Sequence, residues 1–155
     1  SGEKGTNTII SAINKVKNNN FIFKCDKDRV SWDENLKRVS ECDIYIEALQ
    51  SHQNGVPLFL YGVSAIESCA LGKVTFARFP IIDKYEKTFG KCGLISVNTE
   101  EELTNKMTDI LSLPKEQFIN LQKESRKWVE NFYSYEYIGN LFKNILEKEI
   151  EKKRK

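Results

Sequence analysis

The stretch Tyr61-Gly-Val-Ser-Ala-Ile-Glu-Ser-Cys-Ala-Leu-Gly72, followed by Lys73-Val-Thr-Phe-Ala-Arg-Phe79, decides the fold that this sequence predicts. Gly62 is typical of a turn, and apolar residues at helical spacing predict a helix that begins near Val63. Gly72 is typical of the position just after a helix, and the β-branched and aromatic run after it predicts a strand. The stretch is therefore a glycine turn, a helix and a strand, which is one step of an α/β fold.

Glu67 is unusual in this helix because the helical period places it on the apolar side. A carboxylate there is costly unless another group donates hydrogen bonds to it. The free N–H groups of a helix that starts at a glycine turn suit a phosphate. Two interpretations follow: a nucleotide site, with diphosphate at the turn and ribose hydroxyls at Glu67, or a core helix whose Glu67 pairs with an Arg or Lys from elsewhere.

Outside this stretch, helices and strands are predicted to alternate. Expected strands are residues 21–25, 43–47 and 94–97, and residues 48–60 and 80–93 are expected to be loop, with one helical turn around 83–87. Expected helices start at a Thr6 cap, at capping boxes Ser31/Glu34 and Thr99/Glu102, at an N1 Pro114, and near residue 135. This order predicts one domain, residues 1–155, with a Rossmann-like parallel sheet, helices on both faces and further helices at the C-terminus. Ligands of such sheets bind beyond the carboxyl ends of the strands, where the 48–60 loop and the glycine turn both lie.

Composition narrows the function classes. The 155 residues are 40% apolar and 30% charged with a net charge of +2, which is typical of a soluble globular domain and gives no reason to expect nucleic acid as a partner. No apolar run reaches transmembrane length, and no signal peptide is visible. The four scattered cysteines indicate reduced thiols in the cytoplasm, and no metal or other cofactor is expected. Because the chain begins Ser1-Gly2, further sequence is expected upstream.

Several segments, in order, resemble the C-terminal, donor-binding half of retaining glycosyltransferases of the GT-B fold, in particular the group 1, family 4-like enzymes. These are Lys4-Gly-Thr6 before the first helix, Cys42-Asp-Ile-Tyr-Ile46 as a strand, Tyr61-Gly62 with Glu67-Ser-Cys-Ala-Leu-Gly72, and Arg126-Lys-Trp-Val-Glu-Asn-Phe-Tyr-Ser-Tyr135 near the end. The resemblance implies an enzyme that transfers a sugar from a nucleoside-diphosphate sugar to a glycan or lipid-linked acceptor, without a metal. It also implies a missing first strand and a missing N-terminal domain, on which the last helix, about 135–152, would pack.

The resemblance assigns roles to individual residues. Glu67 would take the ribose hydroxyls, Lys4 would help to neutralise the diphosphate, and backbone N–H groups of the turn would assist. The donor-binding set is Lys4, Tyr61, Gly62, Val63, Ser64 and Glu67. The family often has a second Glu where this chain has Phe59, which leaves the sugar contact without its usual residue.

Other residues and functions are also candidates. Glu47 and His52 are candidate sugar contacts, with a solvated surface role as the alternative for each. Arg78 is a candidate diphosphate contact, with pairing to a carboxylate as its alternative. The basic end, Lys152 to Lys155, is a candidate contact with an anionic membrane at the inner face, against a frayed helix end. Against the glycosyltransferase stand two other functions: a non-catalytic interaction module, which Phe59 favours, and half of a sugar-nucleotide epimerase.

Overall fold

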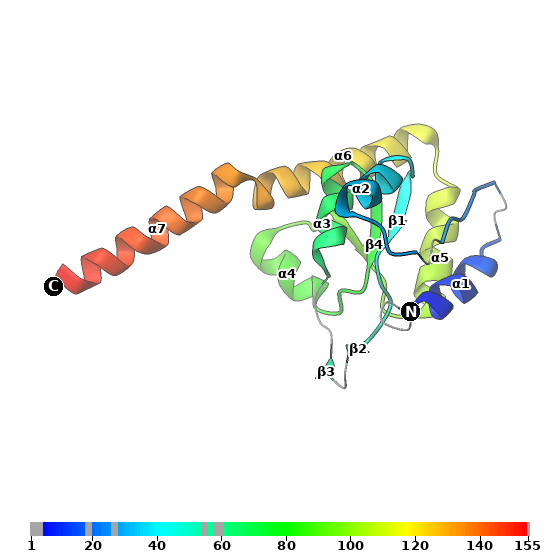
Figure 1. Ribbon diagram of the computed structural model, residues 1–155, viewed down its shortest axis with the longest axis horizontal. Helices are drawn as coiled ribbons and strands as arrows, with labels where there is room; N and C mark the ends of the chain where they lie inside the picture. Colours follow the sequence, from blue (N-terminus) through cyan, green and yellow to red (C-terminus); the bar gives the residue numbers. More distant parts are fainter. Residues whose placement is uncertain (1–4, 18–19, 26–27, 54–55, 58–60, 155) are drawn as a thin grey trace.

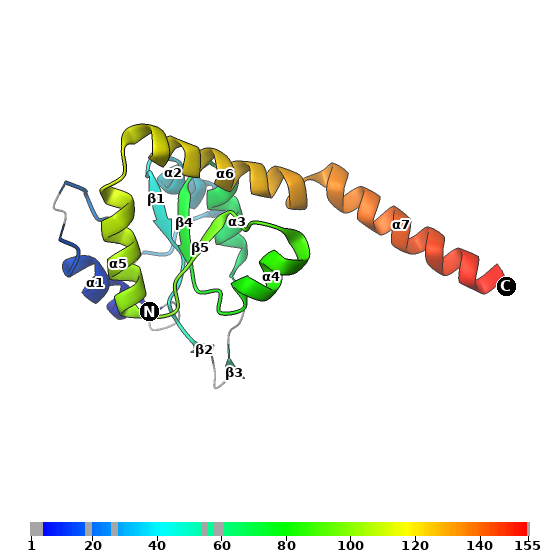
Figure 2. The same cartoon turned by 180° about the vertical axis from the view of Figure 1, so that it is seen from behind.

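The computed structural model describes residues 5–17, 20–25, 28–53, 56–57 and 61–154. Its elements are α1 (Thr6–Asn14), α2 (Trp32–Ser40), β1 (Ile44–Ile46), β2 (His52–Gln53), β3 (Val56–Pro57), α3 (Val63–Ala70), β4 (Val74–Ala77), α4 (Ile82–Phe89), β5 (Leu94–Ser96), α5 (Glu100–Leu111), α6 (Lys115–Tyr133) and α7 (Tyr135–Arg154). Figures 1 and 2 show them from opposite sides.

An open, three-stranded parallel sheet in the order β1-β4-β5 forms the centre. Ile44 pairs with Val74, and Thr75 pairs with Leu94, so β4 is hydrogen-bonded on both sides. All four residues of β4 are buried. Successive side chains of a strand point to opposite faces, so this strand must be covered by apolar layers on both sides.

Helices supply those two layers. One face is covered by α1 and α5, which lie side by side in both views and enclose Val74, Phe76 and Val97. The other face is covered by α3 and α6, which pack around Ala77 and Leu94. The expected α/β class, with a parallel sheet covered on both faces, is therefore confirmed.

Several expected helix ends are also present. Ser31 accepts a hydrogen bond from the Glu34 N–H, and Thr99 accepts one from the Glu102 N–H, as the two capping boxes predict. Gly72 follows α3 with φ 68°, a left-handed conformation that glycine adopts without strain.

The predicted strand at residues 21–25 is wrong. Phe21 packs against the core, but Ile22 is 87% exposed and Phe23 is 38% exposed, and the described part of this segment forms no ladder. A strand persists where a neighbour takes up its backbone groups and a layer covers its side chains. This segment has no strand partner within the described residues, and the core covers Phe21 but not Ile22 or Phe23.

Four local expectations also need correction. Residues 80–93 contain a full helix, α4, whose Ile82 and Tyr85 pack on the core at helical spacing. The 48–60 segment carries the short antiparallel pair β2–β3 rather than loop throughout. Gly5, not Thr6, is the N-cap of α1, and Pro114 is the N-cap of α6 rather than its first residue.

The last helix, α7, stands away from the rest of the molecule in both views. Its apolar side chains are exposed: Leu141 43%, Phe142 63%, Ile145 50%, Leu146 60% and Ile150 50%. Among the described residues, the helices are all too short or too polar to cross a bilayer.

A steric prediction follows from the contact between β5 and α6. A Cβ on Gly93 would lie 2.7 Å from the Trp128 Cβ and 3.0 Å from two ring atoms. We expect Gly93→Ala to lower the free energy of unfolding by about 1–3 kcal/mol because the buried Trp128 has little room to shift. Chemical denaturation measures this.

Gly139→Ala is the matched control, since nothing lies within 4 Å of its Cβ position in α7. It should leave stability unchanged or raise helicity slightly. Equal stability of the two variants would show that the β5–α6 contact is looser than described.

Candidate functional site

The candidate site lies at the carboxyl edge of the parallel sheet. Two helices begin at this edge with glycine N-caps that carry no side-chain cap, α1 at Gly5 and α3 at Gly62. A Cβ on Gly5 would lie 3.1 Å from the Gln50 N, so the start of α1 touches the chain just after β1. Lys4 lies outside the described residues, but its neighbour Gly5 is at the expected edge.

Glu47 holds the glycine turn. Its side chain is only 7% exposed, and both carboxylate oxygens accept from the Gly62 N–H, at 2.9 and 3.1 Å. The Ser64 hydroxyl donates to the same carboxylate at 3.1 Å. An anion at a helix N-terminus is stabilised by the helix dipole, so this glutamate acts as a cap supplied from the neighbouring strand. It takes the N–H that a diphosphate at Gly62 would have used.

Glu67 is partly buried and faces α2. Its Oε1 accepts a hydrogen bond from the Trp32 Nε1 at 2.7 Å. The donor is therefore an indole, not the Arg or Lys that the ion-pair interpretation required. Within the described residues the other oxygen, Oε2, has no hydrogen-bond partner, so it is available to a ligand hydroxyl.

Tyr45 of β1 lies near both carboxylates. Burial raises the pKa of its hydroxyl, a hydrogen bond with Ser64 lowers that pKa, and the nearby charges of Glu47 and Glu67 raise it. The hydroxyl stays protonated at neutral pH, so it acts here as a neutral hydrogen-bonding group.

The remaining donor-binding candidates, Val63 and Tyr61, lie in different surroundings. Val63 is 70% exposed at the start of α3, where the N–H groups of the first turn have no acceptor within the helix. The Tyr61 side chain points the other way: its hydroxyl bonds with that of Tyr133 at 2.6 Å, and its ring meets Phe79 edge-on. Burial, more than any other cause, raises the pKa of the Tyr61 hydroxyl far above its ordinary value. We assign Tyr61 to the aromatic core between α3 and α6.

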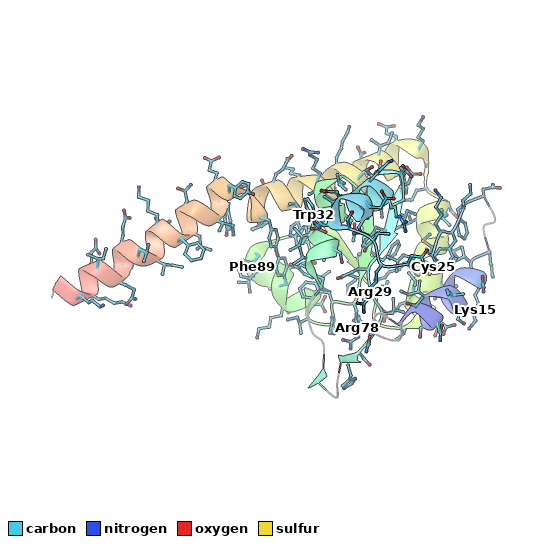
Figure 3. All side chains as sticks on the ribbon, in the orientation of Figure 1. Lys15, Cys25, Arg29, Trp32, Arg78 and Phe89 are labelled. Atoms are coloured by element: carbon cyan, nitrogen blue, oxygen red, sulfur yellow. The ribbon has the colours of Figure 1, made fainter. Side chains whose placement is uncertain are left out.

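The basic and loop candidates lie toward the β2–β3 end of the sheet. Figure 3 labels Arg78 beside this end, with Arg29 above it and Trp32 higher still in that view. The His52 side chain is exposed on β2, and its Nδ1 lies 3.0 Å from the Ser51 Oγ. Phe59 lies outside the described residues. Arg29 and Trp32 were missed from the sequence. By helical spacing Trp32 lies on the same stripe as the buried Val39, so the pattern predicts a packed side chain rather than an exposed indole.

Two buried polar atoms at this edge lack a partner within the described residues. They are the Gln50 Oε1, after β1, and the Asn98 Oδ1, after β5. Buried polar groups are almost always hydrogen-bonded, so unsatisfied oxygens beyond the strand ends mark places where water or a ligand can donate.

The four cysteines are free thiols, and two of them are buried. Burial raises the pKa of the Cys92 thiol to about 11 and that of Cys69 above its ordinary value. These buried thiols are therefore protonated at neutral pH and weak nucleophiles. In the part of the chain that the structure describes, no group of His, Cys, Asp and Glu is arranged to hold a metal ion.

A hollow of about 280 Å³ lies elsewhere, between α4 and α6. Its lining includes Phe89, Cys92 and Trp128, and Cys92 precedes β5, so the hollow is at the opposite edge from the glycine turn. The candidate site is thus an open edge of the sheet and not this hollow.

Comparison of the chain with protein-family models, with curated proteins and with solved structures gave no match.

The cap formed by Glu47 predicts a coupled pair of substitutions. A Cβ on Gly62 would lie 2.3 Å from the Glu47 Oε1, so Gly62→Ala must displace the buried carboxylate. We expect it to cost about 1–3 kcal/mol, the cost of breaking hydrogen bonds to a buried charged group.

Glu47→Ala should cost a similar amount, and the double variant should cost much less than the sum, because the second change has no contact left to break. Urea denaturation of the four proteins measures the coupling. Additive costs would mean that Glu47 does not cap α3.

Proposed function

We propose that this chain is the nucleotide-sugar-binding half of a glycosyltransferase with a GT-B-like architecture. The observation that carries the proposal is Glu67, which lies one helical turn beyond a glycine turn at the carboxyl edge of a parallel sheet. One of its oxygens is fixed by Trp32 and the other is without a partner in the described chain. A fixed carboxylate with an open oxygen is suited to the paired hydroxyls of a ribose.

The diphosphate would bind next to the nucleoside, closer to the start of α3. The distance along the helix from Val63 to Glu67 is about 6 Å at 1.5 Å per residue, which a ribose and its first phosphate can span. The Gly62 N–H is held by Glu47, so the N–H groups of the first turn beyond it, together with Lys4, Arg29 and Arg78, would balance the phosphate charge. Cations are needed here because the Glu47 carboxylate repels the diphosphate.

In the proposed reaction the bond between sugar and diphosphate breaks as an acceptor hydroxyl takes the sugar, with retained anomeric configuration. The helix dipole of α3 and the basic side chains would stabilise the departing diphosphate. The acceptor, a glycan or a lipid-linked glycan, would be held by a second domain. No metal ion is required in this scheme.

The exposed face of α7 supports the need for a second domain. Its apolar side chains, among them Phe142 and Leu146, are open to water, and we propose that the acceptor-binding domain covers them. The exposed Lys152 and Lys153 at its end would then contact an anionic membrane, on the cytoplasmic side that the reduced cysteines suggest.

One observation favours a second candidate, a non-catalytic interaction module. The Glu47 carboxylate occupies the glycine turn in the way a bound anion would. If Glu47 stays there in the presence of nucleotide, the turn is a structural cap and the chain serves as a docking domain.

Nucleotide binding separates the two candidates. We expect UDP, GDP or ADP to bind, and Glu67→Ala to weaken binding by about 10- to 100-fold, the loss of charged hydrogen bonds to ribose hydroxyls. Isothermal titration calorimetry measures both affinities. Glu101→Ala, at an exposed position in the first turn of α5, is the control and should bind like the parent. Absence of binding for all three nucleotides would favour the docking module.

Sugar transfer is a separate test. We expect residues 1–155 alone to give no measurable transfer of radiolabelled sugar from a panel of nucleotide sugars, because their donor site is open to water on the acceptor side. Robust transfer would show that the active site is complete without a second domain.

A further inference from the structure

Trp32 is exposed and hydrogen-bonded at the same time. Its side chain is 62% exposed, yet its Nε1 is fixed by the 2.7 Å hydrogen bond to Glu67. The other tryptophan, Trp128, also donates, to the Tyr85 hydroxyl at 3.0 Å, but its ring is only 3% exposed and packs among aromatic side chains. An exposed indole with a fixed edge is a rigid flat surface that faces water.

We infer that Trp32 and Glu67 together form a nucleoside-binding unit, in which the indole face stacks on the base and the Glu67 Oε2 accepts from the ribose hydroxyls. This inference rests on the proposed function and extends it from a ribose contact to recognition of the whole nucleoside. Stacking on an aromatic side chain is open to every base, so this unit distinguishes ribose from deoxyribose and leaves the choice among bases to other contacts.

The hydrogen bond gives Trp32 a second role, as a positioning residue for Glu67. A glutamate side chain at a partly exposed position samples several rotamers, and ordering them on binding reduces affinity. The indole N–H fixes one oxygen of Glu67 beforehand, so the carboxylate is ordered before a ligand binds. Because a single side chain provides both the stacking face and the N–H, two substitutions can separate these roles.

Two basic side chains are labelled near this unit. In Figure 3, Arg29 and Arg78 are labelled between Trp32 and the β2–β3 end of the sheet. A nucleoside on Trp32 would therefore direct its phosphates toward basic side chains and the start of α3.

The test uses the full chain and three variants. Trp32→Gln keeps an N–H donor of similar reach and removes the ring, whereas Trp32→Phe keeps a ring and removes the N–H. The chain has two tryptophans, so Trp128→Phe leaves Trp32 as the only one, and the tryptophan fluorescence then reports on Trp32 alone. The probes are UDP, GDP, ADP, their 2′-deoxy forms and inorganic pyrophosphate.

We expect nucleoside diphosphates, but not pyrophosphate, to quench Trp32 fluorescence in the Trp128→Phe protein. Trp32→Gln should lose at least about fivefold in affinity, the effect of removing one stacking partner. Trp32→Phe should bind with a smaller loss but should no longer prefer the ribo form over the 2′-deoxy form, since Glu67 is released. If Trp32 had only a structural role, nucleotides would not quench its fluorescence, and Trp32→Phe would keep the preference for the ribo form. Because Trp32 is exposed, both Trp32 variants should fold, which a thermal melt verifies.

The outcomes separate this inference from the proposed function. Nucleotide binding that is equally tight in the parent, Trp32→Gln and Trp32→Phe proteins would overturn the role of Trp32 and leave the proposed function standing. Binding of pyrophosphate as tight as that of the nucleotides would also overturn it, because the nucleoside would then add nothing. Absence of all nucleotide binding to the parent would overturn both.

Discussion

The arrangement of the other elements follows from burying the central strand of the sheet. β4 is hydrogen-bonded to β1 on one side and to β5 on the other, and its four residues are all buried. Its backbone is therefore satisfied only within the sheet, and its side chains are satisfied only if helices cover both faces. Val74 and Phe76 require α1 and α5, and Ala77 requires α3 and α6. The parallel arrangement then brings the loops that follow the strands, and the start of α3, to one edge.

Two glutamates at that edge share a chemistry and differ in their surroundings. Glu47 is buried and receives a backbone N–H and a hydroxyl, so its charge is used inside the fold. Glu67 receives one indole N–H and keeps one oxygen for other donors. The first carboxylate stabilises the turn and the second remains available for binding. Their closeness also means that an anionic ligand needs cations nearby, which is why the arginines on the same side matter to the proposed function.

The aromatic residues divide in a similar way. Tyr61, Phe79, Tyr85 and Trp128 form one buried or half-buried group between α3, α4 and α6, with edge-on ring contacts. Trp32 is outside this group and exposed. α7 adds a further set of open apolar side chains that the described body does not cover. A folded domain normally buries such surfaces, so the indole and α7 are where we propose that a ligand and a partner domain bind.

The sequence by itself determined the α/β class, most element positions and several of the local caps, because these depend on residues close together in the chain. Gly62 and Gly72 mark the ends of α3, Ser31 and Thr99 start their helices, and the apolar period identifies α5 and α6. It also singled out Glu67 as a carboxylate in need of a donor. It did not determine which donor, since Trp32 is distant along the chain and meets Glu67 only when α2 packs on α3. Nor did it reveal that Glu47 caps the glycine turn, because that contact forms only when the end of β1 lies beside the start of α3. The strand expected at residues 21–25 failed for the same reason: local propensity can favour an extended chain, but only a neighbouring strand and a covering layer can make it part of a sheet.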